Sequence, residues 1–185
     1  MCSTINYRSE GVIEEVERHA RDGRVHYIPH RAVITPHTST TKLRVVYDAS
    51  AKTKPDNFSL NECLFRGLVL LHDLCGMILR LRMFPIAIVA DIEKAFLQIG
   101  LHEDQRDVTR FLRIKNPNNP SVSPDNVQEH RFARVAFGVI SSPILLGATI
   151  NFHLDSYESE VADKIQSDIY VDNLITGCHT FDEAC

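Results

Sequence analysis

An uninterrupted apolar run, residues 86–90, leads directly into Asp91. Such a run is typical of a strand that is buried on both faces of a sheet. A second acid, Asp172, ends another short strand-like stretch, residues 168–171. A carboxylate next to apolar sequence is costly to bury unless it is paired or binds a cation. If the two strands are neighbours, both carboxylates lie at one edge of the same sheet.

This pair of aspartates suits Mg²⁺, a hard cation that is normally held by one or two carboxylates together with substrate phosphates. Two ions about 3.5–4 Å apart would stabilise the attacking and leaving oxygens of a phosphoryl transfer. The alternative is that Asp91 and Asp172 are turn or cap residues, which is the commoner role of a lone aspartate at a strand end.

The first half of the chain predicts a short helix, a hairpin and a second helix. Residues 9–22 read as an amphipathic helix whose apolar stripe contains Val12, Ile13 and Val16. Residues 25–34 and 42–47 are rich in β-branched and aromatic residues and predict two strands of a protruding hairpin. Its second strand carries two cations, Lys42 and Arg44. Leucine and isoleucine at helical spacing predict a helix over residues 69–82.

The second half predicts more strands and one further helix. Strands are expected at 108–114 and 131–137, separated by a proline-rich loop, 116–126. Ser142 as N-cap and Pro143 in the first turn predict a helix that extends to about residue 153. A final hairpin is expected from strands 168–171 and 174–176, with Asp172 and Asn173 as its two-residue turn.

Composition limits the class of protein. A length of 185 residues fits one domain, and the apolar fraction of 44% and charged fraction of 24% are ordinary for a globular protein. No apolar run is long enough for a membrane span, and no signal peptide is evident at the N-terminus. The five cysteines form no CxxC pair, which favours a reducing, intracellular compartment over secretion.

The net charge of -4 hides an uneven distribution. Residues 24–54 contain six basic residues and one acid, whereas residues 116–185 contain ten acids and three basic residues. The first segment could bind phosphates and the second could bind cations. Solvated surfaces that bind nothing explain these basic and acidic segments equally well.

Four segments occur in an order that carries more information than any one of them: residues 42–50 (KLRVVYDAS), 90–99 (ADIEKAFLQI), 136–143 (AFGVISSP) and 170–173 (YVDN). They resemble the successive motifs of a retroelement reverse transcriptase, and their residues are similar to those of the Bel/Pao branch of LTR retrotransposons. The resemblance extends from about Tyr27 to Gly177, most of the chain.

The resemblance implies an α+β fold, with a palm-like antiparallel sheet backed by helices and a fingers β-hairpin. Residues 1–23 would be an N-terminal helical segment, and residues 24–185 would be the fingers and palm, ending before the thumb. The implied activity is RNA-directed DNA polymerase, with two Mg²⁺ ions for which Mn²⁺ can substitute. The implied partners are an RNA or DNA template-primer, deoxynucleoside triphosphates and the remaining polyprotein regions (protease, thumb, RNase H and integrase). The location would be the cytoplasm or the nucleus.

The resemblance also assigns roles to individual residues. Those matching metal-binding or catalytic positions are Asp91, Ile92 (through its backbone carbonyl), Asp172 and Asn173. Those matching nucleotide-binding positions are Lys42, Arg44, Phe96, Phe137 and Gly138. Arg44 would grip the triphosphate, and the Phe96 ring would exclude a ribose 2′-hydroxyl. Ser142, Pro143 and Tyr170 would support the site. Without the motif, Phe96 would be an ordinary core aromatic and Lys42 a solvated strand residue.

Three departures from the family pattern stand out. Asn173 replaces the second aspartate of the hairpin motif and removes one negative charge. Phe137 stands where retroviral enzymes commonly have glutamine, so one polar contact to the nucleotide is absent. The sequence ends soon after the hairpin, so we expect little primer extension by this chain alone. The rival interpretation is a non-catalytic retrotransposon remnant that keeps the palm fold and binds nucleic acid weakly. An unrelated magnesium phosphohydrolase would need a water-activating base, and none is identifiable.

Overall fold

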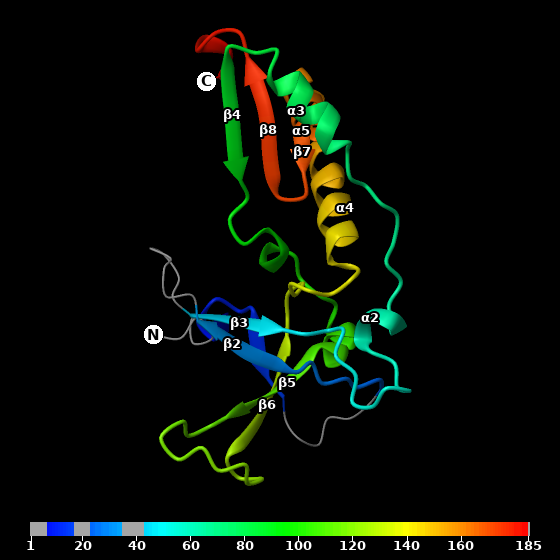
Figure 1. The fold of residues 1–185 in the computed structure, drawn as a ribbon, viewed down its shortest axis with the longest axis vertical. Coiled ribbons are helices and arrows are strands. Elements are labelled where there is room, and N and C mark those ends of the chain that lie inside the picture. Colours follow the sequence, from blue (N-terminus) through cyan, green and yellow to red (C-terminus); the bar gives the residue numbers. More distant parts are fainter. Residues whose placement is uncertain (1–6, 17–22, 35–42, 185) are drawn as a thin grey trace. The chain divides into compact units, whose positions relative to one another are not determined.

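The computed structural model describes residues 7–16, 23–34 and 43–184. They form a mixed α+β fold of antiparallel sheets and helices, as expected (Figure 1). The chain divides into two compact units. The first contains residues 1–65 and 96–142, and the second contains residues 66–95 and 143–185.

The first unit contains a three-stranded sheet and a separate hairpin. The sheet has the order β1-β6-β5, and its strands are β1 (Ile13–Glu15), β6 (Val127–Phe132) and β5 (Arg110–Ile114). The hairpin pairs β2 (His30–Ile34) with β3 (Leu43–Tyr47), which confirms the predicted hairpin over its described part. Short helices of the unit include α2 (Leu60–Cys63), a 3-10 helix, Glu103–Thr109, and most of a second 3-10 helix, Ala95–Gln98.

Aromatic packing forms the core of the first unit. Tyr47, at the end of β3, meets the rings of Phe111 and Phe132 at centroid distances of 5.0 and 4.8 Å. Edge-to-face ring pairs of this kind add about 0.5–1.5 kcal/mol beyond the area that they bury. The fingers-like hairpin is therefore held by its Tyr47 end against the three-stranded sheet.

The predicted helix over residues 9–22 is wrong for the described residues after Ser9, where a short helical turn, residues 7–9, ends. Residues 13–15 form β1, which pairs with β6, and residues 17–22 lie outside the described residues. Val12, Ile13 and Val16 are buried, as expected for an apolar stripe. They lie in or next to a strand, however, and not on one face of a helix. Pairing with a distant strand overrode the helical spacing of these three residues.

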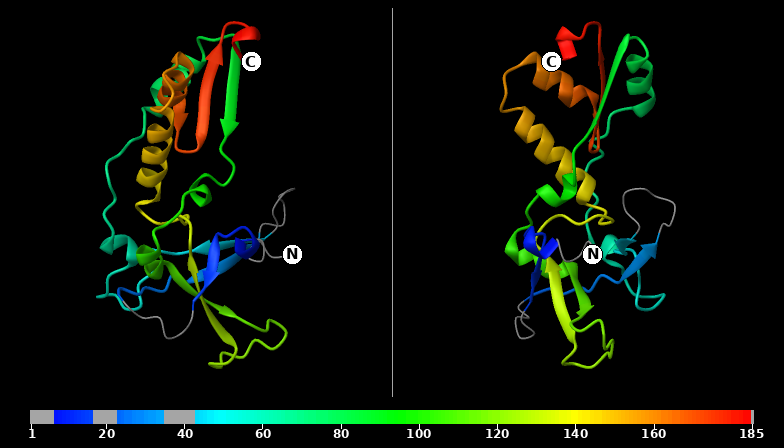
Figure 2. Two further views of the ribbon diagram at one scale, coloured as in Figure 1. Left: turned by 180° about the vertical axis from the view of Figure 1, so that it is seen from behind. Right: turned by 90° about the vertical axis from the view of Figure 1, so that its left-hand side faces the viewer.

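The second unit contains a sheet of order β4-β8-β7. Its strands are β4 (Ile86–Asp91), β8 (Asn173–Cys178) and β7 (Ile169–Tyr170). Its helices are α3 (Leu74–Leu81), α5 (Glu160–Asp168) and most of α4 (Ser142–Leu154), with a short 3-10 helix, Asp182–Ala184, at the end. Helices α3 and α5 both pack against β8, the central strand (Figures 1 and 2).

Burial of β4 on both faces, predicted from its apolar sequence, is wrong. Ile86 and Ile88 are half-buried, whereas the side chain of Val89 is 68% exposed. Among the described residues β4 pairs only with β8, so it is an outer strand of an antiparallel sheet with one open face. A continuous apolar run predicts two-sided burial only when other elements cover both faces.

The observed boundaries of two further elements differ from the predicted ones. Helix α3 begins after the N-cap Asp73, so residue 71 lies before it, and the strand expected at 131–137 is β6, which ends at Phe132. Helix α5 was not predicted. Among the described residues, none of the helices combines the length and apolar character needed to cross a lipid bilayer.

His130, in β6, is completely buried and stacks on the ring of Phe111 at a centroid distance of 5.6 Å. Burial lowers the pKa of His130 from its ordinary value of 6.5. Burial also lowers the pKa values of His26 and His30, in the same unit. These three rings therefore stay neutral in the folded chain at pH values where the unfolded chain already binds protons.

The free energy of unfolding is consequently expected to decrease as the pH falls below 6.5, the ordinary pKa of a histidine in the unfolded chain. In that range the unfolded state binds more protons than the folded state, so stability is fully present above it and is lost on acidification. His130→Phe should lose less of its unfolding free energy on acidification, because the stacked ring remains while the titrating group is removed. Urea unfolding from about pH 7 to about pH 5 measures the effect. His102→Phe, at an exposed position, is the control, and an equal pH dependence in both variants would contradict the role of His130.

Candidate functional site

The register of β4 and β8 places the two predicted metal-binding segments side by side. Asp91, the last residue of β4, lies opposite Asn173, the first residue of β8. The Ile92 backbone N–H donates to the carbonyl of Asp172 at 2.8 Å. Directly opposed Cα atoms in an antiparallel pair are about 4.5–5.5 Å apart. Asp91, Asp172 and Asn173 therefore meet at one end of the sheet in the second unit.

The hairpin turn consists of Val171 and Asp172, because Tyr170 pairs with Asn173. The predicted turn, Asp172-Asn173, is wrong by one residue. Val171 has a φ of 60°, in the left-handed region that β-branched residues rarely adopt. Backbone strain of this kind costs about 1–3 kcal/mol and persists only where the surroundings impose it. The surrounding hairpin therefore imposes this conformation, which places Asp172 at the tip of a tight two-residue turn.

Asn173 contacts Asp172 directly. Its Nδ2 amide donates to Asp172 Oδ1 at 2.8 Å. The bond occupies one carboxylate oxygen and leaves the other oxygen of Asp172 available for a cation. Asn173 is also a neutral residue opposite Asp91 and next to Asp172, so it adds no further charge repulsion at this end of the sheet.

The donors present here fit a magnesium site. Asp91 is exposed and Asp172 is half-buried, so both carboxylates can be reached from solvent. The Ile92 carbonyl accepts the Ala95 N–H at 3.2 Å and retains a second lone pair. Two carboxylates with carbonyl oxygens and waters are a donor set that Mg²⁺ accepts. No cluster of three or more His, Cys, Asp or Glu side chains with metal-binding geometry occurs among the described residues, in keeping with Asn173 at the third position.

The residues with predicted nucleotide roles that the structure describes lie in the first unit. Phe96, in the 3-10 helix Ala95–Gln98, meets the ring of Phe137 edge-to-face at a centroid distance of 5.1 Å. Phe137 is 50% exposed, so this ring pair is partly open to solvent. Arg44 is exposed on β3, opposite Val33. Lys42 lies outside the described residues.

Asn61 is a residue of this region that the sequence reasoning missed. Its Nδ2 donates to the carbonyl of Gly138 at 3.0 Å, and its Oδ1 accepts the Ile140 N–H at 2.8 Å. The same Nδ2 lies 2.8 Å from the Ser50 hydroxyl. One amide therefore connects the motif around Ser50 with the loop at Gly138. The only local signal was the capping box of Ser59 and Glu62, which starts α2 and orients Asn61.

Gly138 has a φ of +83°, and a Cβ at this position would lie 3.2 Å from the carbonyl oxygen of Tyr47. The left-handed conformation alone costs a non-glycine residue about 1–2 kcal/mol. The loop that carries Phe137 therefore depends on glycine both for its backbone and for close contact with β3.

Gly138→Ala is expected to lower the free energy of unfolding by more than Gly11→Ala does. Gly11 also has a positive φ, +68°, but a Cβ added there would have no neighbour within 4 Å. The difference between the variants therefore reports the contact with Tyr47, beyond the roughly 1–2 kcal/mol common to both. Urea denaturation measures both values, and equal destabilisation would show that the loop adjusts without cost.

The three predicted support residues occupy different positions. Ser142 is the first residue of α4, and its hydroxyl donates to the carbonyl of Ala136 at 2.7 Å. The prediction of Ser142 as N-cap is therefore wrong by one position, and Pro143 is the second helical residue. Tyr170 is half-buried in β7 and pairs with Asn173.

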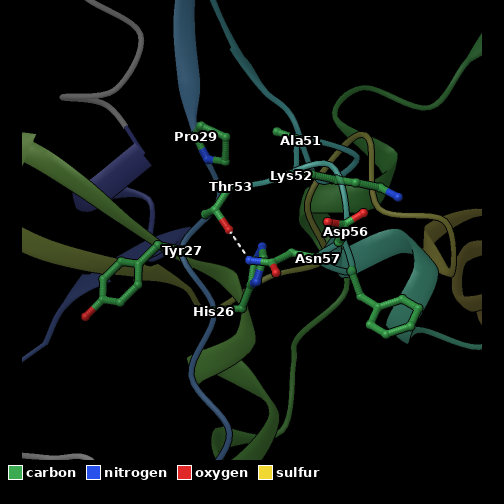
Figure 3. A pocket seen from close by; sticks show the side chains of 9 residues that line it. His26, Tyr27, Pro29, Ala51, Lys52, Thr53, Asp56 and Asn57 are labelled. Atoms are coloured by element: carbon green, nitrogen blue, oxygen red, sulfur yellow. Dashed lines mark hydrogen bonds between the residues drawn. The ribbon is translucent and has the colours of Figure 1, made fainter.

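A pocket of about 720 Å³ in the first unit contains none of the predicted site residues (Figure 3). Residues from two loops line it: His26, Tyr27, Pro29, Ala51, Lys52, Thr53, Asp56, Asn57 and Phe58. Asn57 donates to the Thr53 hydroxyl at 2.6 Å inside this lining. The Lys52 ammonium pairs with Glu62 at 2.7 Å and, with the Ser59 donors, lowers the pKa of Glu62 to about 2. Lys52 is therefore already neutralised by a neighbour.

No model of a protein family matches the sequence, and no curated protein sequence matches it either. Among solved structures, the prototype foamy virus protease-reverse transcriptase is similar, with a TM-score of 0.63 and 14% sequence identity. The alignment covers 97% of this chain and 19% of that protein, so the chain spans about a fifth of its length. At this identity the likeness concerns the fold and does not distinguish the Bel/Pao branch from other retroelements. The chain therefore has a reverse-transcriptase-like fold.

Proposed function

We propose that this chain is the fingers and palm of an RNA-directed DNA polymerase from a Bel/Pao-type LTR retrotransposon. The observation that carries the proposal is the β4–β8 register, which places Asp91 opposite Asn173 and next to Asp172. The reverse-transcriptase-like fold and the four ordered motifs support it. The reaction joins the α-phosphorus of a deoxynucleoside triphosphate to a primer 3′-oxygen and releases pyrophosphate, and the hydroxyl proton passes to water.

Asp91 and Asp172 would hold the metal through their carboxylates, and Ile92 through its backbone carbonyl. Bound Mg²⁺ would lower the barrier by neutralising negative charge on the attacking oxygen, the phosphate and the leaving group. The protein contributes mainly by positioning. The strained turn at Val171 and the bond from Asn173 both restrict where the Asp172 carboxylate can lie.

In this proposal the contacts to the nucleotide are the ones that the motifs assign to individual residues. Arg44 and Lys42 would bind the triphosphate, and a guanidinium can bridge two phosphate oxygens. The Phe96 ring would fill the space that a ribose 2′-hydroxyl needs, so the site would select deoxynucleotides by shape. Phe137 packs against Phe96 and would hold its ring in place, and Gly138 would let the backbone approach the nucleotide closely.

The proposal also implies partners and a location. The partners are an RNA or DNA template with its primer, deoxynucleoside triphosphates and the other parts of a retrotransposon polyprotein. Because the template is made inside the cell, the location is the cytoplasm or the nucleus.

The test is Mn²⁺ titration of the ¹⁵N-labelled chain by NMR, since Mn²⁺ broadens amide signals near its binding site. The expected result is selective broadening of the amides around Asp91 and Asp172, with tighter binding when a deoxynucleoside triphosphate is added. Broadening spread evenly over exposed acids would exclude the proposed site.

Asn173 favours a second candidate, a non-catalytic domain that keeps the fold. Only two carboxylates remain in the site, and the amide of Asn173 engages one of them. A chain of this kind would bind a nucleic acid without binding Mn²⁺ at Asp91 and Asp172. The same titration, repeated with a short RNA–DNA hybrid, separates the two candidates.

A further inference from the structure

Asp168 is a buried carboxylate to which the proposed reaction gives no role. It is the last residue of α5, immediately before β7, and it is 7% exposed. Four residues later the chain reaches Asp172 at the tip of the hairpin. A buried charge is costly unless partners compensate it.

The partners of Asp168 come from three elements of the second unit. Its Oδ2 accepts the Thr176 hydroxyl at 2.6 Å and the Lys164 ammonium at 3.0 Å. Its Oδ1 lies 3.7 Å from the Arg80 guanidinium and accepts the Ser167 hydroxyl at 3.3 Å. One carboxylate therefore joins β8, α5 and α3.

The bond to Thr176 closes the base of the hairpin. Asp168 precedes the first arm, β7, and Thr176 lies in the second arm, β8. Between them are Val171 and Asp172, the turn. The bond therefore connects the two arms to each other and, through Asp168, to both helices.

The bond between Asp168 and Thr176 lies on the face of the sheet away from Asp91. Asn173 is opposite Asp91, and Thr176 is opposite Ile88. Side chains alternate between the faces of a strand, so residues 173 and 176 point to opposite faces. Asp168 is buried on the face away from Asp91 and accepts three hydrogen bonds, so it is not placed as a third metal ligand, and its effect on the proposed site passes through the hairpin.

The charge of Asp168 is retained in the folded chain. Burial acts to raise the pKa of Asp168, but donation by Thr176 and Lys164 outweighs it, and the pKa lies below its ordinary value. A charged acceptor makes stronger hydrogen bonds than a neutral one.

We infer that Asp168 is a positioning residue whose bond to Thr176 holds the Asp172 hairpin in its metal-binding conformation. The inference rests on the proposed function for the identity of the site that is positioned. Groups that orient metal ligands commonly change metal affinity about 10–100-fold when they are removed.

The test compares three variants of the whole chain: Thr176→Val, which keeps the shape and removes the hydroxyl, Thr176→Ser, which restores the hydroxyl, and Asp168→Asn. The control is Asp163→Asn on the exposed side of α5. Two quantities are measured by NMR: the hydrogen-exchange rates of the amides at residues 170–174, and the affinity for Mn²⁺.

Thr176→Val is expected to accelerate exchange in the hairpin and to weaken Mn²⁺ binding, each by about tenfold. Thr176→Ser and Asp163→Asn should resemble the original chain in both measurements. Unchanged hairpin exchange in Thr176→Val would overturn the inference. Faster exchange with unchanged Mn²⁺ affinity would also overturn it, because the bond would then only stabilise the fold.

The design separates this inference from the proposed function. If the original chain does not bind Mn²⁺ at Asp91 and Asp172, the proposed function fails, and the exchange rates alone decide whether Asp168 holds the hairpin. If Asp168→Asn does not fold, the comparison of Thr176→Val with Thr176→Ser still decides the role of the bond.

Discussion

Asp91→Asn is expected to weaken Mn²⁺ binding by about a hundredfold or more while leaving the fold intact. Asp91 is exposed at the end of β4, and no hydrogen bond or ion pair joins its side chain to another described residue. Asparagine has nearly the same shape, so the β4–β8 pairing should persist. The lost negative charge, however, is one of the two carboxylates that the proposed site contains.

Two measurements on the same samples check this expectation: NMR line broadening by Mn²⁺ and thermal unfolding. Asp125→Asn, at an exposed position in the first unit, removes the same charge and is the matched control. In any longer polypeptide that contains this chain and synthesises DNA, Asp91→Asn should also abolish nucleotide incorporation. Unaltered Mn²⁺ affinity would remove Asp91 from the proposed site, and a large loss of stability would show that its carboxylate is structural.

The hairpins of this chain could be predicted because their signals are local. The β2–β3 hairpin and strands β4 and β8 follow from short stretches of β-branched and apolar residues. The order of the motifs and the apolar pattern of the strands predicted that Asp91 and Asp172 lie close together. The β4–β8 register brings these two segments together. The turn was misplaced by one residue, since the Asp-Asn pair favours a turn locally but the pairing of Asn173 with Asp91 extends the ladder.

The features that escaped prediction depend on contacts between distant segments. Ile13 lies in a strand because it pairs with Phe132, far along the chain. Asn61 bonds to Gly138, and no spacing in the sequence relates these two positions. The sequence predicted Asp168 as the first residue of a strand, whereas it is the last residue of α5. Its contacts include Thr176 and Arg80, which lie in other elements. Local propensity carries no information about such partners.

The identity of residue 173 determines how strongly the proposed site attracts a cation. Asn173→Asp is expected to tighten Mn²⁺ binding about tenfold or more, because a third carboxylate would lie beside Asp172 and opposite Asp91. The same change should lower the stability of the chain without metal. It replaces the donor that bonds to Asp172 Oδ1 with a like charge, and the strained turn at Val171 then loses a restraint.

Added Mn²⁺ should therefore stabilise Asn173→Asp more than it stabilises the original chain, because a ligand stabilises the state that binds it to an extent that grows with its affinity. Thermal unfolding with and without Mn²⁺ measures both effects in one experiment. Asn118→Asp, in an exposed loop of the first unit, adds the same charge and controls for non-specific attraction. If Asn173→Asp loses stability but gains no Mn²⁺ affinity, the end of the β4–β8 sheet is not a cation site. If it gains affinity and loses stability without metal, Asn173 is the residue that keeps the metal-free hairpin stable by limiting its charge.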